Sequence, residues 1–238
     1  MKKLKKKIIQ VYLSTAFGMI GLYSYGQKNS SFCANQFEND IPMAHLLCSF
    51  YKGSDPFHGK IGEMNQWGRG TVYLYTGDSV EGRFFVYNRL GSNLIWINEK
   101  SRNLLLVDKS TVKCFSIISD KDSVHRIYEY FPLSSLFYID GEGAFLELLV
   151  KDIISLYVLN TIETIPISNN LVSHEYYFVH KADGTLVRTF LNRRSLCASL
   201  SNSKDFLKHL RKIGLKANNR GNLIKAVKEY NSFLKNRI

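Results

Sequence analysis

The sequence predicts an α+β fold that is mainly β, with an antiparallel β-meander or sheet as its body and two or three C-terminal helices. Three observations carry this prediction. The chain contains 14 Tyr and 15 Phe, residue types that favour strands. From Gly70 onward, short apolar runs alternate with turn signals built from Gly, Asn and Asp. After Arg193 the apolar residues change to the spacing of an amphipathic helix.

The first hairpin of the body is predicted over residues 71–87. Its turn is Thr76-Gly77-Asp78-Ser79, and we expect Val72 and Leu74 to share one face of the sheet with Phe84 and Val86. Further strands are predicted at residues 94–98, 104–107, 112–118, 125–131 and 135–139.

Two later segments complete the predicted sheet. Residues 145–159 are apolar enough for a buried helix or for a hairpin that turns at Lys151-Asp152, and we favour the hairpin. Residues 175–190 form a second hairpin, because Asp183-Gly184 is a strong turn signal between two β-rich runs.

Helices are predicted at the C-terminal end of the chain. A short helix covers residues 193–200, and a second begins near Ser203 and ends at Gly214, a favoured helix C-terminal residue. The third covers residues 222–236. The apolar residues expected on their buried faces are Phe206, Leu207, Leu210, Ile213, Leu223, Ile224, Val227, Tyr230 and Leu234. Helices this short are unstable alone, so we expect them to dock on the sheet or on each other.

The N-terminus has the features of a cleavable secretory signal peptide. Five Lys among the first seven residues precede an uncharged apolar stretch, Ile8–Tyr23, and Ser24-Tyr25-Gly26 supplies small residues at a cleavage site. A retained membrane anchor is the alternative, but 16 residues are short of the roughly 20 that span a bilayer. Cys33 lies too far from the apolar stretch for lipidation.

These features divide the chain into four segments. We expect a signal peptide at 1–26, an irregular N-terminal extension at 27–66 with a short helix near 42–51, an antiparallel β-rich domain at 67–200, and a basic helical segment at 201–238 docked on it. After cleavage no transmembrane span is expected.

The positive charge of the chain is unevenly distributed. The net charge is +12, but five of these charges belong to the signal-peptide lysines. Residues 201–238 hold ten Lys and Arg against two acidic residues, so residues 27–200 are close to neutral. The basic character of the mature chain therefore lies in its C-terminal helices.

The candidate contacts with a partner come from this basic segment. They are Lys204, Lys208, Arg211, Lys212 and Lys216. Cationic side chains on an amphipathic helix can bind anionic lipid or lipopolysaccharide phosphates, although most such runs are simply solvated helix faces. Nucleic acid is not expected as a partner, because the chain is predicted to leave the cytoplasm.

Other candidate sites are weaker. His174 and His180 share a strand face without a known metal-ligand spacing, and Asp140 with Glu142 forms an acidic pair in a Gly-rich turn. An aromatic platform for a sugar or peptide could be built from Trp67, Trp96, Tyr73, Tyr75 and Tyr87, although a core role is the simpler interpretation. No catalytic residue, cofactor or metal is predicted.

The cysteine count is even, and an oxidising compartment permits disulfides. The four are Cys33, Cys48, Cys114 and Cys197. They allow three pairings, among which the sequence does not choose.

Several local motifs resemble one group of proteins. They are Gly70-Thr71-Val72-Tyr73-Leu74 followed by Gly77-Asp78 and Glu81-Gly82, Phe145-Leu146-Glu147-Leu148-Leu149-Val150, Tyr176-Tyr177-Phe178, and a helical tail that closes on Tyr230-Asn231. The chain is similar in these motifs to uncharacterised exported β-rich proteins of Bacteroidota-type bacteria. The resemblance implies an envelope location and brings no activity. One departure is Asp152, where such a hairpin turn would carry Gly.

The sequence therefore favours an exported envelope protein, periplasmic, outer-membrane-associated or extracellular, that acts as a non-enzymatic binding or structural module. Its expected partner is an anionic envelope surface or another envelope protein, in the latter case as a subunit of a larger complex. The alternative is a glycan or peptide hydrolase with an unrecognised site, for which Asp140 and Glu142 are the candidates.

Overall fold

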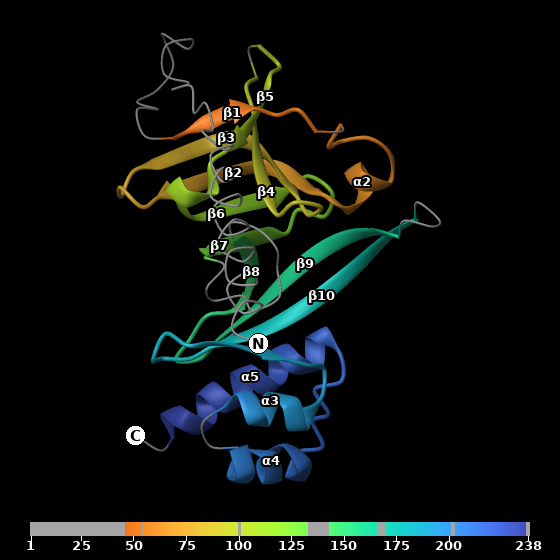
Figure 1. Ribbon diagram of the computed structural model, residues 1–238. Coiled ribbons are helices and arrows are strands. Elements are labelled where there is room, and N and C mark those ends of the chain that lie inside the picture. Colours follow the sequence, from red (N-terminus) through yellow and green to blue (C-terminus); the bar gives the residue numbers. More distant parts are fainter. Residues whose placement is uncertain are drawn as a thin grey trace, which may run out of the picture. The chain divides into compact units, whose positions relative to one another are not determined.

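The computed structural model describes residues 46–53, 55–99, 101–132, 143–165, 170–200 and 203–236, which all belong to one unit, Phe32–Ile238 (Figure 1). The expected signal peptide, Cys33, the strand expected at 135–139 and the Asp140–Glu142 pair lie outside the described residues.

One antiparallel sheet of eleven strands forms the body of the described chain, which bears out the predicted mainly-β, α+β fold class. The strands are β1 (Cys48–Phe50), β2 (Gln66–Leu74), β3 (Ser79–Asn88), β4 (Asn93–Ile97), β5 (Leu104–Val107), β6 (Val112–Ser119), β7 (His125–Phe131), β8 (Ala144–Val150), β9 (Ser155–Ile165), β10 (Asn170–His180) and β11 (Leu186–Thr189). The helices are α2 (Gly59–Met64), α3 (Arg193–Ser199), α4 (Ser203–Lys212) and α5 (Arg220–Lys235).

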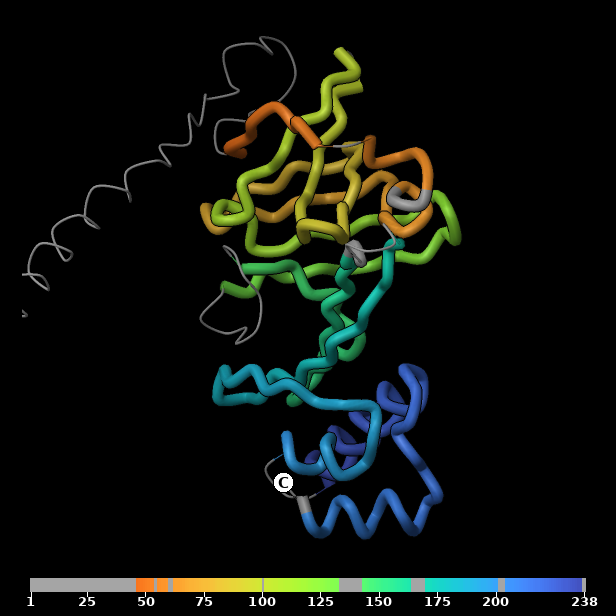
Figure 2. Tube along the Cα trace, turned by 45° about the vertical axis from the view of Figure 1, so that its right-hand side comes forward, coloured from red at the N-terminus to blue at the C-terminus, as the bar shows by residue number. Residues whose placement is uncertain are grey.

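The strand order shows that the first part of the sheet is rolled. The order is β1-β5-β4-β3-β2-β6-β7-β8-β9-β10-β11, so three strands separate β5 from β6 although only residues 108–111 connect them. In a flat sheet these two strands would lie about 19 Å apart. A link of this length reaches about 17 Å when fully extended, and here three of its residues form a compact 3₁₀ turn. The sheet must therefore curl (Figures 1 and 2).

The interior of this roll is an aromatic-rich core, which we call the roll core. It collects buried residues from β1 to β8, including Phe115, Tyr128 and Phe145. The ring of Phe115 stacks on that of Tyr128 at 4.7 Å and meets the ring of Phe145 edge-on at 4.9 Å. Five Tyr and Phe side chains of the chain are thus buried in this core.

The first hairpin faces the core differently from the prediction because it contains a β-bulge. The β2–β3 register shifts by one residue between Gly70 and Val72, and Gly82 adopts φ +64° in the opposing strand. A one-residue shift exchanges the two faces of a strand. As a result Val72 shares the roll core with Phe85 and Tyr87, and not with Phe84 and Val86 as predicted.

A second core, the helix core, lies between the last strands and the helices. Alternate residues of β9 and β10 pack against buried residues of α3, α4 and α5, including Phe206, Leu210 and Tyr230. The predicted docking of the helices on the sheet is therefore confirmed. On the opposite face, β8, β9 and β10 carry a smaller cluster that includes Leu146, Tyr157 and Phe178.

The segment 145–159 is a hairpin, as favoured, and its turn is stabilised without glycine. The side chain of Asp152 accepts a hydrogen bond of 2.9 Å from the backbone N–H of Ile153 and pairs with Lys235 of α5 at 2.6 Å. This local hydrogen bond gives an Asp a role at the position where Gly was expected.

The end of α4 follows the predicted glycine. Gly214 adopts φ +71°, its N–H donates to the carbonyl of Arg211, and the N–H of Leu215 donates to the carbonyl of Leu210. This pair of bonds is the Schellman arrangement. Ile213, predicted on the buried face, is 48% exposed because it lies at the cap where the chain leaves the helix.

The short helix predicted near residues 42–51 is not formed over the described part, 46–51. Cys48–Phe50 instead make the edge strand β1, which pairs with β5. The apolar residues Leu46 and Cys48 enter the roll core, and this tertiary burial overrides the local helix preference.

Asn231 should be essential for the docking of α5. Its buried side chain accepts from the N–H of Ile154 at 2.8 Å and donates to the carbonyl of Ile154 at 2.9 Å. Replacing it with Leu leaves both backbone groups without a partner, so Asn231→Leu should lower the free energy of unfolding by about 2–4 kcal/mol. Urea titration measures this loss. The neighbouring exposed variant Ser232→Ala should stay within about 0.5 kcal/mol, and an equal effect of both variants would contradict the assignment.

Candidate functional site

The basic residues singled out in the sequence lie on the solvent side of α4 and in the chain just after it. Lys204, Lys208 and Arg211 follow one another at helical i, i+4, i+7 spacing and share a face. Lys212 and Lys216 extend the group, and all five residues are exposed. We call these five residues the α4 basic surface.

None of the five side chains is engaged in an ion pair within the part of the chain that the structure describes. The one acidic side chain of α5, Glu229, is engaged by His209 at 2.8 Å. Lys225 and Lys228 add two further exposed cations on α5. The surface therefore carries charge that the described residues do not neutralise.

The opposite side of α4 holds the helix in place. Phe206 and Leu210 are fully buried, and the Phe206 ring meets Tyr230 edge-on at 4.8 Å and lies 5.8 Å from that of Phe233. The cations are thus presented from a helix whose orientation is set by packing against α5.

The two histidines of β10 do not form a metal site. They are six residues apart on one strand, a separation of about 20 Å. His174 lies 3.7 Å from Glu163, whereas the ring of His180 contacts Phe131 and Tyr157. Over the described ranges, no group of three or more His, Cys, Asp or Glu side chains could hold a metal ion.

The candidate aromatic platform is also divided. Tyr87 and Trp96 are buried in the roll core. Trp67 packs between Phe57 and Phe84, while Tyr73 and Tyr75 are exposed. These five aromatic residues do not form one surface.

Two of the cysteines are thiols whose burial disfavours the thiolate form. Cys114 and Cys197 are free thiols, so none of the pairings that would join all four cysteines is formed. Burial raises the pKa of both thiols and disfavours the nucleophilic thiolate.

A buried polar cluster around Glu147 was missed in the sequence. On β8, alternate residues Phe145, Glu147 and Leu149 point to the same face of the sheet. Phe145 belongs to the roll core and Leu149 packs on the helix core. Glu147, only 6% exposed, therefore stands where the two cores meet. We call this cluster the Glu147 seam.

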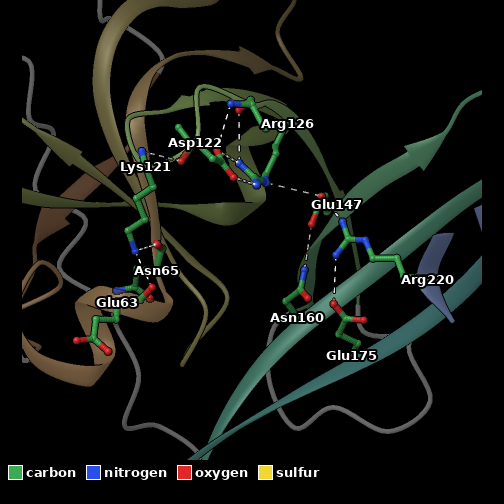
Figure 3. A network of polar contacts seen from close by, with 11 residues as sticks. Glu63, Asn65, Lys121, Asp122, Arg126, Glu147, Asn160, Glu175 and Arg220 are labelled. Carbon is green, nitrogen blue, oxygen red and sulfur yellow. Dashed lines mark hydrogen bonds and ion pairs between the residues drawn. The ribbon is translucent and has the colours of Figure 1, made fainter.

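Three donors surround the Glu147 carboxylate (Figure 3). Arg220, at the start of α5, donates to one oxygen at 2.7 Å, and the Arg126 guanidinium of β7 lies 3.9 Å from the same oxygen. The side-chain amide of Asn160 donates to the other oxygen at 3.1 Å. Arg220 also bonds Glu175 of β10 at 3.2 Å, so the seam links α5 with residues of four strands, β7 to β10.

The seam continues toward α2. Arg126 forms two hydrogen bonds with Asp122, at 3.0 and 2.5 Å, and these hold the pKa of that carboxyl far below its usual value. The adjacent Lys121 donates to three backbone carbonyls, those of Gly62, Glu63 and Asn65, between 2.6 and 2.8 Å. Burial of Lys121 lowers its pKa.

Tyr128 faces Glu147 across the β7–β8 pair. Its buried hydroxyl has no hydrogen-bond partner among the described residues, and burial followed by the charge of Glu147 raises its pKa well above the usual value. The neighbouring Tyr87, whose ring lies 4.6 Å away, instead donates to the Phe145 carbonyl.

The Glu147 carboxylate is held by hydrogen bonds at both of its oxygens. No hydroxyl or thiol nucleophile bonds it within the described residues. Its charges are paired across elements far apart in sequence, which is the arrangement of a structural ion network. The available sequence signal was a single acidic residue inside the apolar run 144–150.

Comparison of this chain with protein-family models, with curated proteins and with solved structures yields no match. Within the described residues, every helix is too short or too polar to cross a membrane. What the protein does must therefore be inferred from its own surface and contacts.

Glu147→Gln should destabilise the fold by about 2–3 kcal/mol, because Arg220 and Arg126 lose their shared counter-charge. This value lies below the 3–5 kcal/mol typical of broken buried pairs, since Arg220 is partly exposed. The double variant with Arg220→Gln should lose less than the sum of the two single losses, as chemical denaturation can measure. Glu99→Gln breaks an exposed pair with Arg69 and should cost less than about 1 kcal/mol. Strict additivity would refute the coupling.

Proposed function

We propose that this protein is exported to the cell envelope and binds an anionic surface there through the α4 basic surface, without catalysis. The supporting observation is that Lys204, Lys208, Arg211, Lys212 and Lys216 are all exposed and lack an acidic partner in the described chain. The N-terminal features of a signal peptide support export as the route to this location. The proposal of no catalysis is supported by Glu147, whose two carboxylate oxygens are both hydrogen-bonded and therefore not available for acid–base chemistry.

Electrostatics gives the expected strength of such binding. Each Lys or Arg near a negatively charged membrane contributes about 1 kcal/mol, and the attraction falls off within a Debye length of about 8 Å at physiological salt. Five cations on one helix and its following turn are therefore enough for measurable binding that weakens at high salt. The half-exposed Ile213 beside Lys212 adds an apolar contact at the same surface.

The first expected outcome concerns binding to vesicles. The exported form of the protein, purified from the producing cells, should cosediment with vesicles containing phosphatidylglycerol. It should not cosediment with pure phosphatidylcholine vesicles. A variant with Gln at all five positions of the α4 basic surface should bind at least about tenfold more weakly, because several kcal/mol of attraction are lost.

A matched control separates the surface from the total charge. Lys52, Arg102, Lys113, Lys151 and Lys181 lie on the sheet and its loops, and changing them to Gln removes the same charge. This control should retain binding. Equal binding by both five-site variants, or equal loss in both, rules out a specific role for α4.

The second expected outcome concerns export. Mass spectrometry of the protein from the envelope fraction of the producing cells should find an N-terminus at Gln27, after the small residues Ser24 and Gly26. An intact Met1 or Lys2 terminus on protein in the cytoplasmic fraction would overturn the proposed location while leaving the vesicle result interpretable.

A further inference from the structure

A long open edge of the sheet lies on β10. This strand pairs with β9 along its whole length, Asn170–His180, whereas β11 covers only Tyr177–His180. Residues 170–176 therefore have no strand on their outer side within the described chain (Figure 1). The outermost strands of the sheet are shorter, since β1 has three residues and β11 has four.

The open edge faces solvent and not the body of the protein. Asn170, Ser173 and Glu175 are exposed. On the partner strand β9, Leu159 and Ile162 are buried. Backbone N–H and C=O groups along such an edge are satisfied by water alone and can pair with another strand.

The edge also lacks three of the features that normally prevent pairing, and Glu175 is its one acidic residue. Residues 170–176 contain no Pro and no Lys, and the β9–β10 register runs without a bulge. Natural edge strands usually carry at least one of these features. Leu171 and Val172 instead make the middle of the edge apolar.

We propose that two copies of this chain associate by pairing their β10 edges antiparallel, around a twofold axis at Ser173. This register pairs all seven residues 170–176 with their counterparts. A strand addition of this length forms about six to eight backbone hydrogen bonds. It extends the sheet across the two copies and covers the open β10 edge of each copy.

The side chains of the edge are compatible with this register. Ser173 meets Ser173 of the second copy, Val172 lies opposite His174, and Leu171 lies opposite Glu175. No two like charges face each other, and opposite residues share the same face of the sheet. A second copy is favoured over a foreign strand because the sequence of the edge is complementary to itself in the register of greatest overlap.

A charge-exchange experiment at Ser173 tests the proposal. Lys at this position places two ammonium groups opposite each other in a pair of copies, and Glu places two carboxylates there. Ser173→Lys and Ser173→Glu should each be monomeric in sedimentation velocity at concentrations where the unmodified chain is a dimer. An equimolar mixture of the two variants should dimerise again, because unlike charges now meet.

The control uses another exposed position of the same region. Ala182→Lys and Ala182→Glu lie in the turn between β10 and β11 and should leave the dimer unchanged. Circular dichroism checks that all four variants fold. A monomeric unmodified chain at about 100 µM, or a dimer that both Ser173 variants leave intact, overturns the proposal.

Discussion

The ion pair between Glu147 and Arg220 connects the roll core with the helix core. The sheet is continuous, but its inner face serves two separate apolar cores, and Glu147 occupies the boundary between them. A carboxylate at such a place is costly unless it is paired. Arg220 provides the pair from the first residue of α5, so burial of Glu147 requires that the helix core be assembled on the strands. The two cores are thereby made dependent on each other by one charge.

The strands could be predicted from local sequence patterns, whereas the Glu147 seam could not, because its contacts join residues far apart in the chain. Alternation and turn residues are local, so the hairpins at 145–159 and 175–190 could be predicted from spacing alone. The facing of β2 and β3 depended on a bulge at Gly82, which shifts the register by one residue. The Glu147 seam joins residues far apart in sequence: Glu147 pairs with Arg220, 73 positions later, and with Arg126, 21 positions earlier. Only the strand order brings them together, and this order was not readable from sequence.

The α4 basic surface exists because only a few positions of α4 are needed to bury the helix against the protein. Two apolar residues, Phe206 and Leu210, fix the inner side of α4, and the Schellman bonds at Gly214 end the helix so that Leu215 returns to the core. The remaining positions are free to carry charge at little cost to stability. Basic helix faces that are already satisfied by local acids have no reason to bind a partner. Here Glu229 of α5 is already bonded by His209, and none of the five cations has an ion-pair partner in the described chain.

The proposed strand pairing and the proposed surface binding involve different elements of the fold. The open edge of β10 is formed by backbone groups, while the basic surface is formed by side chains of α4, so neither proposal requires the other. Two copies joined through β10 would carry ten of these cations in one particle. When two binding surfaces are linked, the second binds at an effective concentration set by the linkage, and the overall affinity exceeds that of either alone. Because each cation contributes only about 1 kcal/mol, linking two such surfaces would raise the overall affinity for an anionic surface.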